Sequence, residues 1–158
     1  MYLSIIIPVL NEVDKISDDI IFLSDYLTHN NIKGEIIISD DGSTDGTSEI
    51  ANKTSSIENV RLIILKENKH HGKGHAVRKG VNQSKGENIL IIDSGKTITI
   101  DFINKGVNMI QNNKYQIILG SRHLPGSILH KQLIWYRRLA SIIFRIYTKL
   151  LFPSMWIQ

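Results

Sequence analysis

Apolar residues follow two kinds of pattern along the 158-residue chain. Short, nearly continuous runs rich in Ile and Val are typical of strands that are buried on both faces of a parallel sheet. Between these runs, apolar residues recur with the spacing of an amphipathic helix. The runs that predict strands are Leu3–Val9, Glu35–Ser39, Val60–Leu65, Asn88–Ile92 and Gln116–Leu119.

Helices are predicted between these strands. Asn11 is the expected N-cap of the first helix, and Thr44 is the expected N-cap of a second helix that extends to Thr54. Two further helices are expected at about 74–84 and 99–112. The first helix carries one apolar stripe, formed by Val13, Ile16, Ile20, Leu23 and Leu27. The alternation of strand and helix predicts an α/β fold with a doubly wound, mostly parallel sheet and right-handed crossovers.

Composition narrows the class of protein. An apolar content of 42% is enough for a chain of this length to build the core of one domain. The absence of cysteine excludes disulfides and thiolate zinc sites, and is compatible with a reducing compartment. Residues 1–9 are expected to form a strand rather than a secretory signal, because they lack a basic start and a cleavage site.

Charge is distributed unevenly along the chain. Residues 1–101 contain 11 Lys or Arg and all 15 Asp and Glu, whereas residues 102–158 contain 8 Lys or Arg and no acid. A nucleic-acid binder with a uniformly basic surface would not divide its charge in this way, so we expect no nucleic-acid partner. The division predicts an acidic-to-neutral body with a basic end that meets an anionic partner.

Polar and glycine-bearing segments follow all five predicted strands. In doubly wound sheets, ligands bind beyond the carboxyl ends of the strands, so these segments are expected to lie along one edge. They read PVLNE, SDDGSTDGT, KENKHHGKGHA, DSGKT and GSRH in chain order. Their convergence predicts a binding site at this edge of the sheet.

Three common sites can be excluded at that edge. A dinucleotide site would need the motif G-x-G-x-x-G directly after the first strand, where the chain instead has Pro8 to Glu12. The stretch Gly72-Lys73-Gly74 does not complete the motif either, because Val77 stands where its last glycine would be. No P-loop sequence and no G-x-S-x-G nucleophile turn occur in the chain.

The remaining candidates suit a nucleotide sugar. Asp40 and Asp41 end the second predicted strand, and a carboxylate there can accept a hydrogen bond from a uracil imide or a ribose hydroxyl. The alternative is that one of the two caps its loop. Lys73 supplies positive charge beside a helix N-terminus, which suits a phosphate. Arg122 follows the last predicted strand, where it either binds phosphate or is simply exposed.

Taken together, these segments resemble the family 2 glycosyltransferases, which are inverting enzymes with a GT-A fold. The matching stretches cover roughly residues 4–122 in the family's order and spacing. They read SIIIPVLNE, IIISDDGSTDGT, NKHHGKGHAVRKGVNQSKGENILIID and ILGSR. The Gly-Lys-Gly-x-Ala-x-Arg-x-Gly stretch is most similar to the branch that makes dolichyl- or undecaprenyl-phosphate sugars. The resemblance implies transfer from a nucleoside-diphosphate sugar, a UDP-sugar, to a polyprenyl or dolichyl phosphate.

The resemblance also implies roles for individual residues. Asp93 and Arg122 would be catalytic, with Asp93 in the place of the first acid of an Asp-x-Asp metal motif. Arg122 would face the donor diphosphate or the acceptor phosphate. The residues expected to bind the nucleotide sugar are Pro8, Asn11, Glu12, Asp40, Asp41, Lys73, Gly74 and Asp93.

The chain departs from the family at the metal motif, because Gly95 stands where the second acid would be. One strong oxygen ligand for Mg²⁺ or Mn²⁺ is therefore missing. Asp93 could still hold the ion together with diphosphate oxygens, water and Thr97. Alternatively, Lys96 could neutralise the phosphates without a metal. His75 and His123 are minor candidates in the same motifs.

A second departure is that no acid follows Asp101, so a general base of the family's usual position is absent. A sugar hydroxyl would need such a base, whereas a lipid phosphate is already ionised near neutral pH, with a second pKa of roughly 6. The missing base therefore favours the lipid-phosphate acceptor. It equally fits a truncated or degenerate module that binds nucleotide sugars without catalysis.

The last predicted feature is a basic amphipathic helix at 129–152, within a segment 124–158 that follows the core domain 1–123. A helix of this kind either lies on an anionic bilayer or packs on the sheet with a solvated basic face. We expect peripheral membrane contact, at the cytoplasmic face of a membrane, and a docking role is the alternative to catalysis. Its apolar face would be Leu133, Tyr136, Ala140, Ile143, Tyr147 and Leu150, opposite Lys131, Arg138, Arg145 and Lys149.

Overall fold

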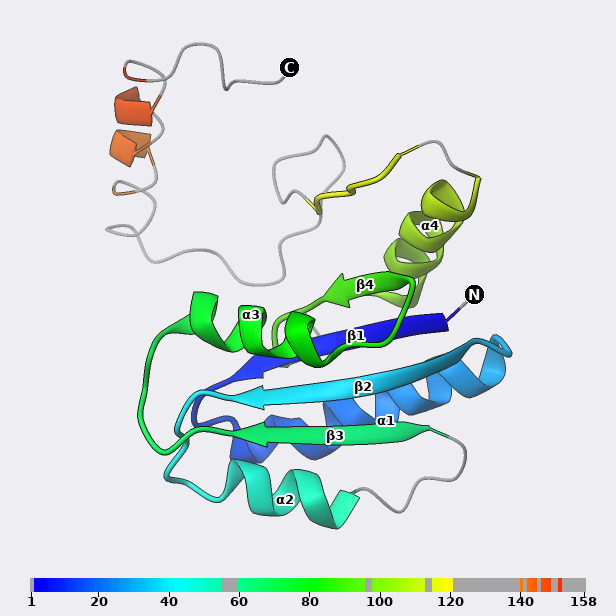
Figure 1. The fold of residues 1–158 in the computed structure, drawn as a ribbon. Coiled ribbons are helices and arrows are strands. Elements are labelled where there is room, and N and C mark those ends of the chain that lie inside the picture. Colours follow the sequence, from blue (N-terminus) through cyan, green and yellow to red (C-terminus); the bar gives the residue numbers. More distant parts are fainter. Residues whose placement is uncertain are drawn as a thin grey trace. The chain divides into compact units, whose positions relative to one another are not determined.

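The computed structural model describes residues 2–54, 60–95, 98–112 and 115–120, and then 140, 142–144, 146–148 and 151. The chain divides into two compact units, Met1–Gln116 and Ile117–Gln158. The first unit holds four strands and four helices among its described residues (Figure 1). They are β1 (Tyr2–Val9), α1 (Val13–His29), β2 (Lys33–Asp40), α2 (Thr47–Lys53), β3 (Arg61–Lys66), α3 (Lys73–Gln83), β4 (Asn88–Ile91) and α4 (Ile100–Gln111).

All strand pairs are parallel, and the strand order is β3-β2-β1-β4. Helices cover both faces, with α1 and α2 on one face and α3 on the other (Figure 1). This is the doubly wound α/β arrangement that the sequence predicts, and the order of the chain reverses between β1 and β4. The four Ile- and Val-rich runs up to Ile92 form strands, as predicted. The two central strands, β1 and β2, are the ones that helices cover on both faces.

The core lies mainly between the sheet and α1. Leu3, Ile5, Ile7 and Val9 of β1 point to this face, and they meet the buried stripe of α1. Four of the five predicted stripe residues are buried; they are Ile16, Ile20, Leu23 and Leu27. On the opposite face, α3 approaches closely at Gly80, where an added Cβ would lie 2.5 Å from Ile6 Cγ2.

Two helix starts differ from the prediction. The N-cap of α1 is Glu12, not Asn11, and Asn11 has a left-handed backbone with φ 56°. The helix α2 begins at Thr47 instead of just after Thr44, and Gly46 with φ 93° is its N-cap. Both errors arise because the turn after β2 continues through residue 46, and its side chains bond to the segment that starts α1.

The predicted fifth strand at Gln116–Leu119 is wrong. The structure describes residues 115–120 without any strand, and the side chains of Ile117 and Leu119 are 78% and 85% exposed. A strand needs a neighbour for its backbone hydrogen bonds, and among the described residues the sheet ends at β4. In β4 itself, Ile89 and Ile91 are exposed, so this edge strand is not buried on both faces as expected.

In the second unit, the described residues from 140 to 151 are helical, in agreement with the last part of the helix predicted at 129–152, and residues 129–139 of that prediction lie outside the described residues. Their apolar side chains are exposed, including Ile143 and Phe144 at 58% and 67%. The whole predicted basic face, Lys131, Arg138, Arg145 and Lys149, lies outside the described residues. None of the helices among the described residues is long and apolar enough to span a bilayer.

Candidate nucleotide-sugar site

The strand register brings the polar segments to one edge of the sheet. Val9 pairs with Asp40, and Asp40 pairs with Lys66, so β1, β2 and β3 end at the same level. The hydrogen bond from Ile92 N to Ile6 O continues β4 toward the same edge. A hollow of about 300 Å³ lies here, lined by Pro8, Val9, Leu10, Glu12, Asp41, His70, Lys73, Ala76, Asp93 and Ser94.

Five of the predicted site residues line this hollow, namely Pro8, Glu12, Asp41, Lys73 and Asp93. Pro8 lies near the carboxyl end of β1, and the other four come from segments that follow β1, β2, β3 and β4, as the rule for doubly wound sheets predicts. Three other predicted residues, Asn11, Asp40 and Gly74, are absent from its lining. Arg122, Lys96, Thr97 and His123 lie outside the described residues.

Asp40 is a structural residue of the turn that follows β2. Its side chain is buried, its Oδ1 accepts a hydrogen bond from Ser43 N at 2.7 Å, and its Oδ2 accepts one from the Ser48 hydroxyl. These are the bonds of a carboxylate that holds its own loop, which is the alternative considered for this pair of aspartates. The first helical turn of α2 is therefore tied to the end of β2.

Asn11 holds the same turn from the other side. Its backbone N–H donates to Ser43 Oγ at 2.9 Å, and its Oδ1 accepts from Thr44 N at 3.0 Å. The next two amides are bound in a similar way, because Glu12 N donates to Thr47 Oγ1 and Val13 N to Asp45 Oδ2. The start of α1 is thus capped by side chains from residues 43–47 and not by its own sequence.

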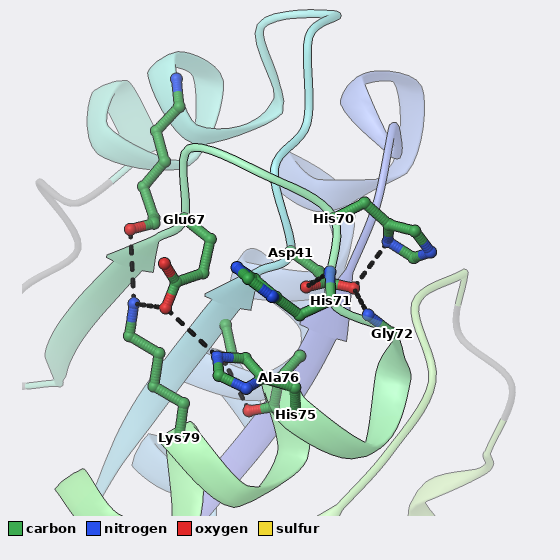
Figure 2. Close-up of polar contacts among 10 residues, drawn as sticks. Asp41, Glu67, His70, His71, Gly72, His75, Ala76 and Lys79 are labelled. Carbon is green, nitrogen blue, oxygen red and sulfur yellow. Dashed lines mark hydrogen bonds and ion pairs between the residues drawn. The ribbon is translucent and has the colours of Figure 1, made fainter.

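Asp41 organises the loop that leads into α3 (Figure 2). Its buried carboxylate accepts backbone hydrogen bonds from His71 at 2.9 Å and Gly72 at 2.7 Å. His70 Nδ1 lies 2.7 Å from Asp41 Oδ2. The turn at Gly42 fits tightly against this loop, because φ is +88° and an added Cβ would lie 2.8 Å from the carbonyl carbon of Lys69.

The same contacts decide the charge of Asp41. Burial alone would raise the pKa of its carboxyl, but the backbone hydrogen bonds from His71 and Gly72 and the neighbouring His70 outweigh burial. The pKa of Asp41 is therefore lowered from the ordinary value of 3.8, and the group is a carboxylate at neutral pH. The negative charge stabilises the 70–72 loop that carries His70 and Lys73 to the hollow.

Lys73 and Asp93 meet across the hollow. Lys73 is the first residue of α3, and its Nζ lies 2.5 Å from Asp93 Oδ1. Both side chains are at least half exposed, so an incoming ligand can reach them. Beside them, Lys15 binds Glu12, and this hydrogen bond raises the pKa of Lys15.

Gly95 has a backbone that other residues adopt with difficulty, with φ +94°. Its N–H donates to Asp19 Oδ2 at 2.8 Å, which fastens the loop after β4 to α1. An added Cβ would lie 3.2 Å from Lys15 Cδ. The described residues contain no group of three or more His, Asp or Glu side chains that could hold a metal ion.

A second polar cluster lies outside the hollow. Glu67 accepts from Lys79 Nζ at 2.6 Å and lies 3.4 Å from His75 Nε2, while the rings of His71 and His75 are 4.7 Å apart (Figure 2). The imidazole of His75 thus meets Glu67, and His75 is not among the residues that line the hollow. This cluster is an ion-pair network on the exposed side of α3.

His70, Ala76 and Ser94 line the hollow but were not singled out from the sequence. Ala76 is placed by Ser39, whose hydroxyl donates to the Ala76 carbonyl at 2.7 Å. Nothing in the local sequence distinguishes His70 from the adjacent His71. The contact with Asp41 places the imidazole of His70, and not that of His71, at the hollow.

Fold and site define a GT-A-type sugar-transferase class, and comparison with known proteins agrees. The profile of glycosyl transferase family 2 matches residues 4–152, so the chain belongs to this family. The dolichyl-phosphate beta-glucosyltransferase of Dictyostelium discoideum is 36% identical over 165 residues, which cover 96% of this chain and 49% of that protein. The human enzyme of the same name is 40% identical over 96 residues, covering 56% of this chain and 29% of that protein.

A solved structure gives the same result. The mannosyltransferase PcManGT from Pyrobaculum calidifontis, in complex with GDP-Man and Mn²⁺, is 29% identical with a TM-score of 0.50. The similarity covers 58% of this chain and 26% of that one. The chain therefore has a GT-A fold, as its sequence predicts, and it spans about half the length of the Dictyostelium relative.

Proposed function

We propose that the protein transfers glucose from UDP-glucose to dolichyl phosphate or a related polyprenyl phosphate, with inversion at the anomeric carbon. The observation that carries this proposal is the hollow at the sheet edge, where Asp41, Lys73 and Asp93 meet. Membership of family 2 and the names of the curated relatives support the reaction and the acceptor.

The reaction is a displacement at C1 of the sugar. An oxygen of the lipid phosphate forms a bond to C1 from the face opposite the nucleotide, and the bond from C1 to the diphosphate oxygen breaks. UDP leaves with that electron pair, so configuration at C1 inverts. Because the attacking phosphate is already ionised, no protein group has to remove a proton.

Each residue of the hollow has a distinct proposed role. Asp41 keeps lone pairs for a uracil imide N–H while it holds the 70–72 loop. Pro8 and Glu12 line the hollow beside the nucleoside, with Glu12 near the ribose. Lys73 meets the diphosphate, and Asp93 orients Lys73. Arg122, which lies outside the described residues, stays a predicted contact of the donor diphosphate or the acceptor phosphate.

A divalent metal is not well supported by the described residues. PcManGT was solved with Mn²⁺, and Asp93 is the corresponding candidate ligand here. Gly95 offers no side chain, its N–H is a donor, and Asp93 is already paired with an ammonium group. We therefore assign no step of the reaction to a metal held by these residues.

A transfer assay tests the function. The chain is incubated with UDP-[¹⁴C]glucose and dolichyl phosphate, and radioactivity is counted in the organic phase. We expect transfer that falls by about tenfold or more in Asp93→Asn, because loss of its charge releases Lys73. Asp25→Asn, an exposed aspartate on α1 outside the hollow, should leave transfer unchanged. Equal activity of both variants would refute the assigned site.

The same assay separates catalysis from a non-catalytic binding module. This second function is favoured by Gly95, which stands where the second acid of the metal motif would be. Tight binding of UDP-glucose without any labelled lipid product would establish the module and refute the transferase.

We also propose that the basic helix at 129–152 contacts the cytoplasmic face of a membrane, where a lipid acceptor would be met. Its exposed apolar residues and the 8 basic residues after 101 support this contact. Liposomes containing anionic lipid should carry the chain upward in a density gradient. Replacing Arg138, Arg145 and Lys149 by Gln should abolish flotation, and unchanged flotation would refute electrostatic docking by this helix.

A further inference from the structure

The segment Asp93–Gly95 lies between two lysine side chains. Lys73 places its ammonium group 2.5 Å from Asp93 Oδ1. Lys15 passes beside Gly95, since a Cβ at position 95 would lie 3.2 Å from Lys15 Cδ. The ammonium group of Lys73 therefore lies next to Asp93, the remaining acid of the motif. The alkyl chain of Lys15 occupies the space beside Gly95, where the second acid would be.

The donor set at this segment suits an anion better than a cation. Ser94 lines the hollow, and its Oγ has no hydrogen-bond partner among the described residues. The Ser94 hydroxyl and the Lys73 ammonium group are donors, as the oxygens of a diphosphate require. Lys15 is not among the residues that line the hollow, but its ammonium group binds Glu12, which is. The backbone N–H of Gly95 is also a donor, although it is bonded to Asp19.

The charge balance leads to the same conclusion. Two carboxylates and a divalent cation carry no net charge, and neither does the pair formed by Asp93 and Lys73. Lys15 is matched with Glu12 in the same way, and their hydrogen bond raises the pKa of Lys15, so the ammonium stays charged near pH 7. The net charge of the site is therefore the same as that of a motif that holds a divalent metal, but the positive charges are those of lysine side chains.

We propose that Lys73, assisted by Lys15, stabilises the leaving diphosphate in place of a protein-bound divalent metal. The inference rests on the proposed function, because it needs a nucleoside diphosphate in the hollow. The positive charges of the two ammonium groups balance the charge that develops on the diphosphate oxygen as the bond to C1 breaks. Asp93 is then a residue that positions Lys73.

Titration calorimetry of UDP and uridine, each in EDTA and in Mn²⁺, tests the inference. Uridine lacks the diphosphate, so it reports the nucleoside half of the site alone. We expect UDP to bind in EDTA, with a gain of less than about threefold from Mn²⁺, which is under 1 kcal/mol. Lys73→Met should weaken UDP binding in EDTA by about tenfold or more and leave uridine binding unchanged.

The matched control is Lys79→Met. Lys79 lies on the same helix and forms the same kind of ion pair, with Glu67 at 2.6 Å, but neither Lys79 nor its partner lines the hollow. It should bind UDP like the unmodified chain. Lys15→Met should show a smaller loss than Lys73→Met, again confined to UDP.

Three results would overturn the inference. UDP binding that requires Mn²⁺ would show that a metal supplies the charge, and would leave the proposed function intact. An equal loss of UDP and uridine binding in Lys73→Met would show that this lysine only shapes the site. If neither UDP nor UDP-glucose bound with or without Mn²⁺, the proposed function would fail together with the inference.

Discussion

Replacing Asp41 by Asn tests whether this carboxylate holds the loop that carries Lys73. The change preserves size but replaces one acceptor oxygen by an NH₂ group. Asp41 Oδ1 and Oδ2 accept from His71 N and Gly72 N, so in the variant one of these partly buried N–H groups faces a donor. The charge opposite His70 is also lost.

The expected cost is about 2–4 kcal/mol in the free energy of unfolding. Hydrogen bonds to a charged group contribute about 1.5–3 kcal/mol, and a buried donor left without an acceptor adds a penalty of about 1–3 kcal/mol. Only part of this sum is lost, since the asparagine oxygen retains one bond. Urea unfolding followed by circular dichroism at pH 7 measures the difference, with Asp25→Asn as the exposed control.

The pH dependence provides the sharper test. Because the pKa of Asp41 is lowered in the folded chain, its contribution to stability is fully present above the ordinary value of 3.8. The contribution is lost as the pH falls from there through the lowered pKa. The stability difference between Asp41→Asn and the unmodified chain should thus shrink on acidification. A difference that is already absent at pH 7, or that stays constant into acid, would refute the assigned contacts.

Three further substitutions test other parts of the fold. Glu35→Ala should cost about 1–3 kcal/mol, because it leaves the buried hydroxyl of Ser4 without its acceptor; an unchanged free energy of unfolding in urea would contradict this. Gly80→Ala should cost about 1–3 kcal/mol, since its Cβ would press on Ile6, and thermal unfolding should show it. Gly95→Asp should cost about 1–2 kcal/mol because of the left-handed backbone, and an unchanged melting temperature would argue against it.

Sequence patterns were sufficient for features that depend on periodicity and topology. The Ile- and Val-rich runs located β1 to β4, and the stripe on α1 identified its buried face. Asp41, Lys73 and Asp93 were brought together by one rule, because carboxyl ends of parallel strands share an edge. The family resemblance assigned roles that no single segment could.

Features that depend on contacts between loops were not predictable. Asn11 has the composition of an N-cap, yet its side chain bonds to Thr44 because the turn after β2 reaches the start of α1. Asp40 and Asp41 are adjacent, and only their surroundings show that Asp40 is held within its turn. The run at Gln116–Leu119 has the composition of a strand but no neighbouring strand among the described residues.

The interlocked turn at residues 43–47 has a consequence for ligand capture. Side chains of Ser43, Thr47 and Asp45 satisfy three successive amides at the start of α1, so the segment after β1 and the turn after β2, which border the proposed nucleoside pocket, are fastened to each other before any ligand binds. A ligand then binds to a preorganised surface, and little of its binding free energy is lost in ordering these two segments. Removing one of these hydrogen bonds should therefore weaken nucleoside binding, even though its side chain does not contact the nucleoside.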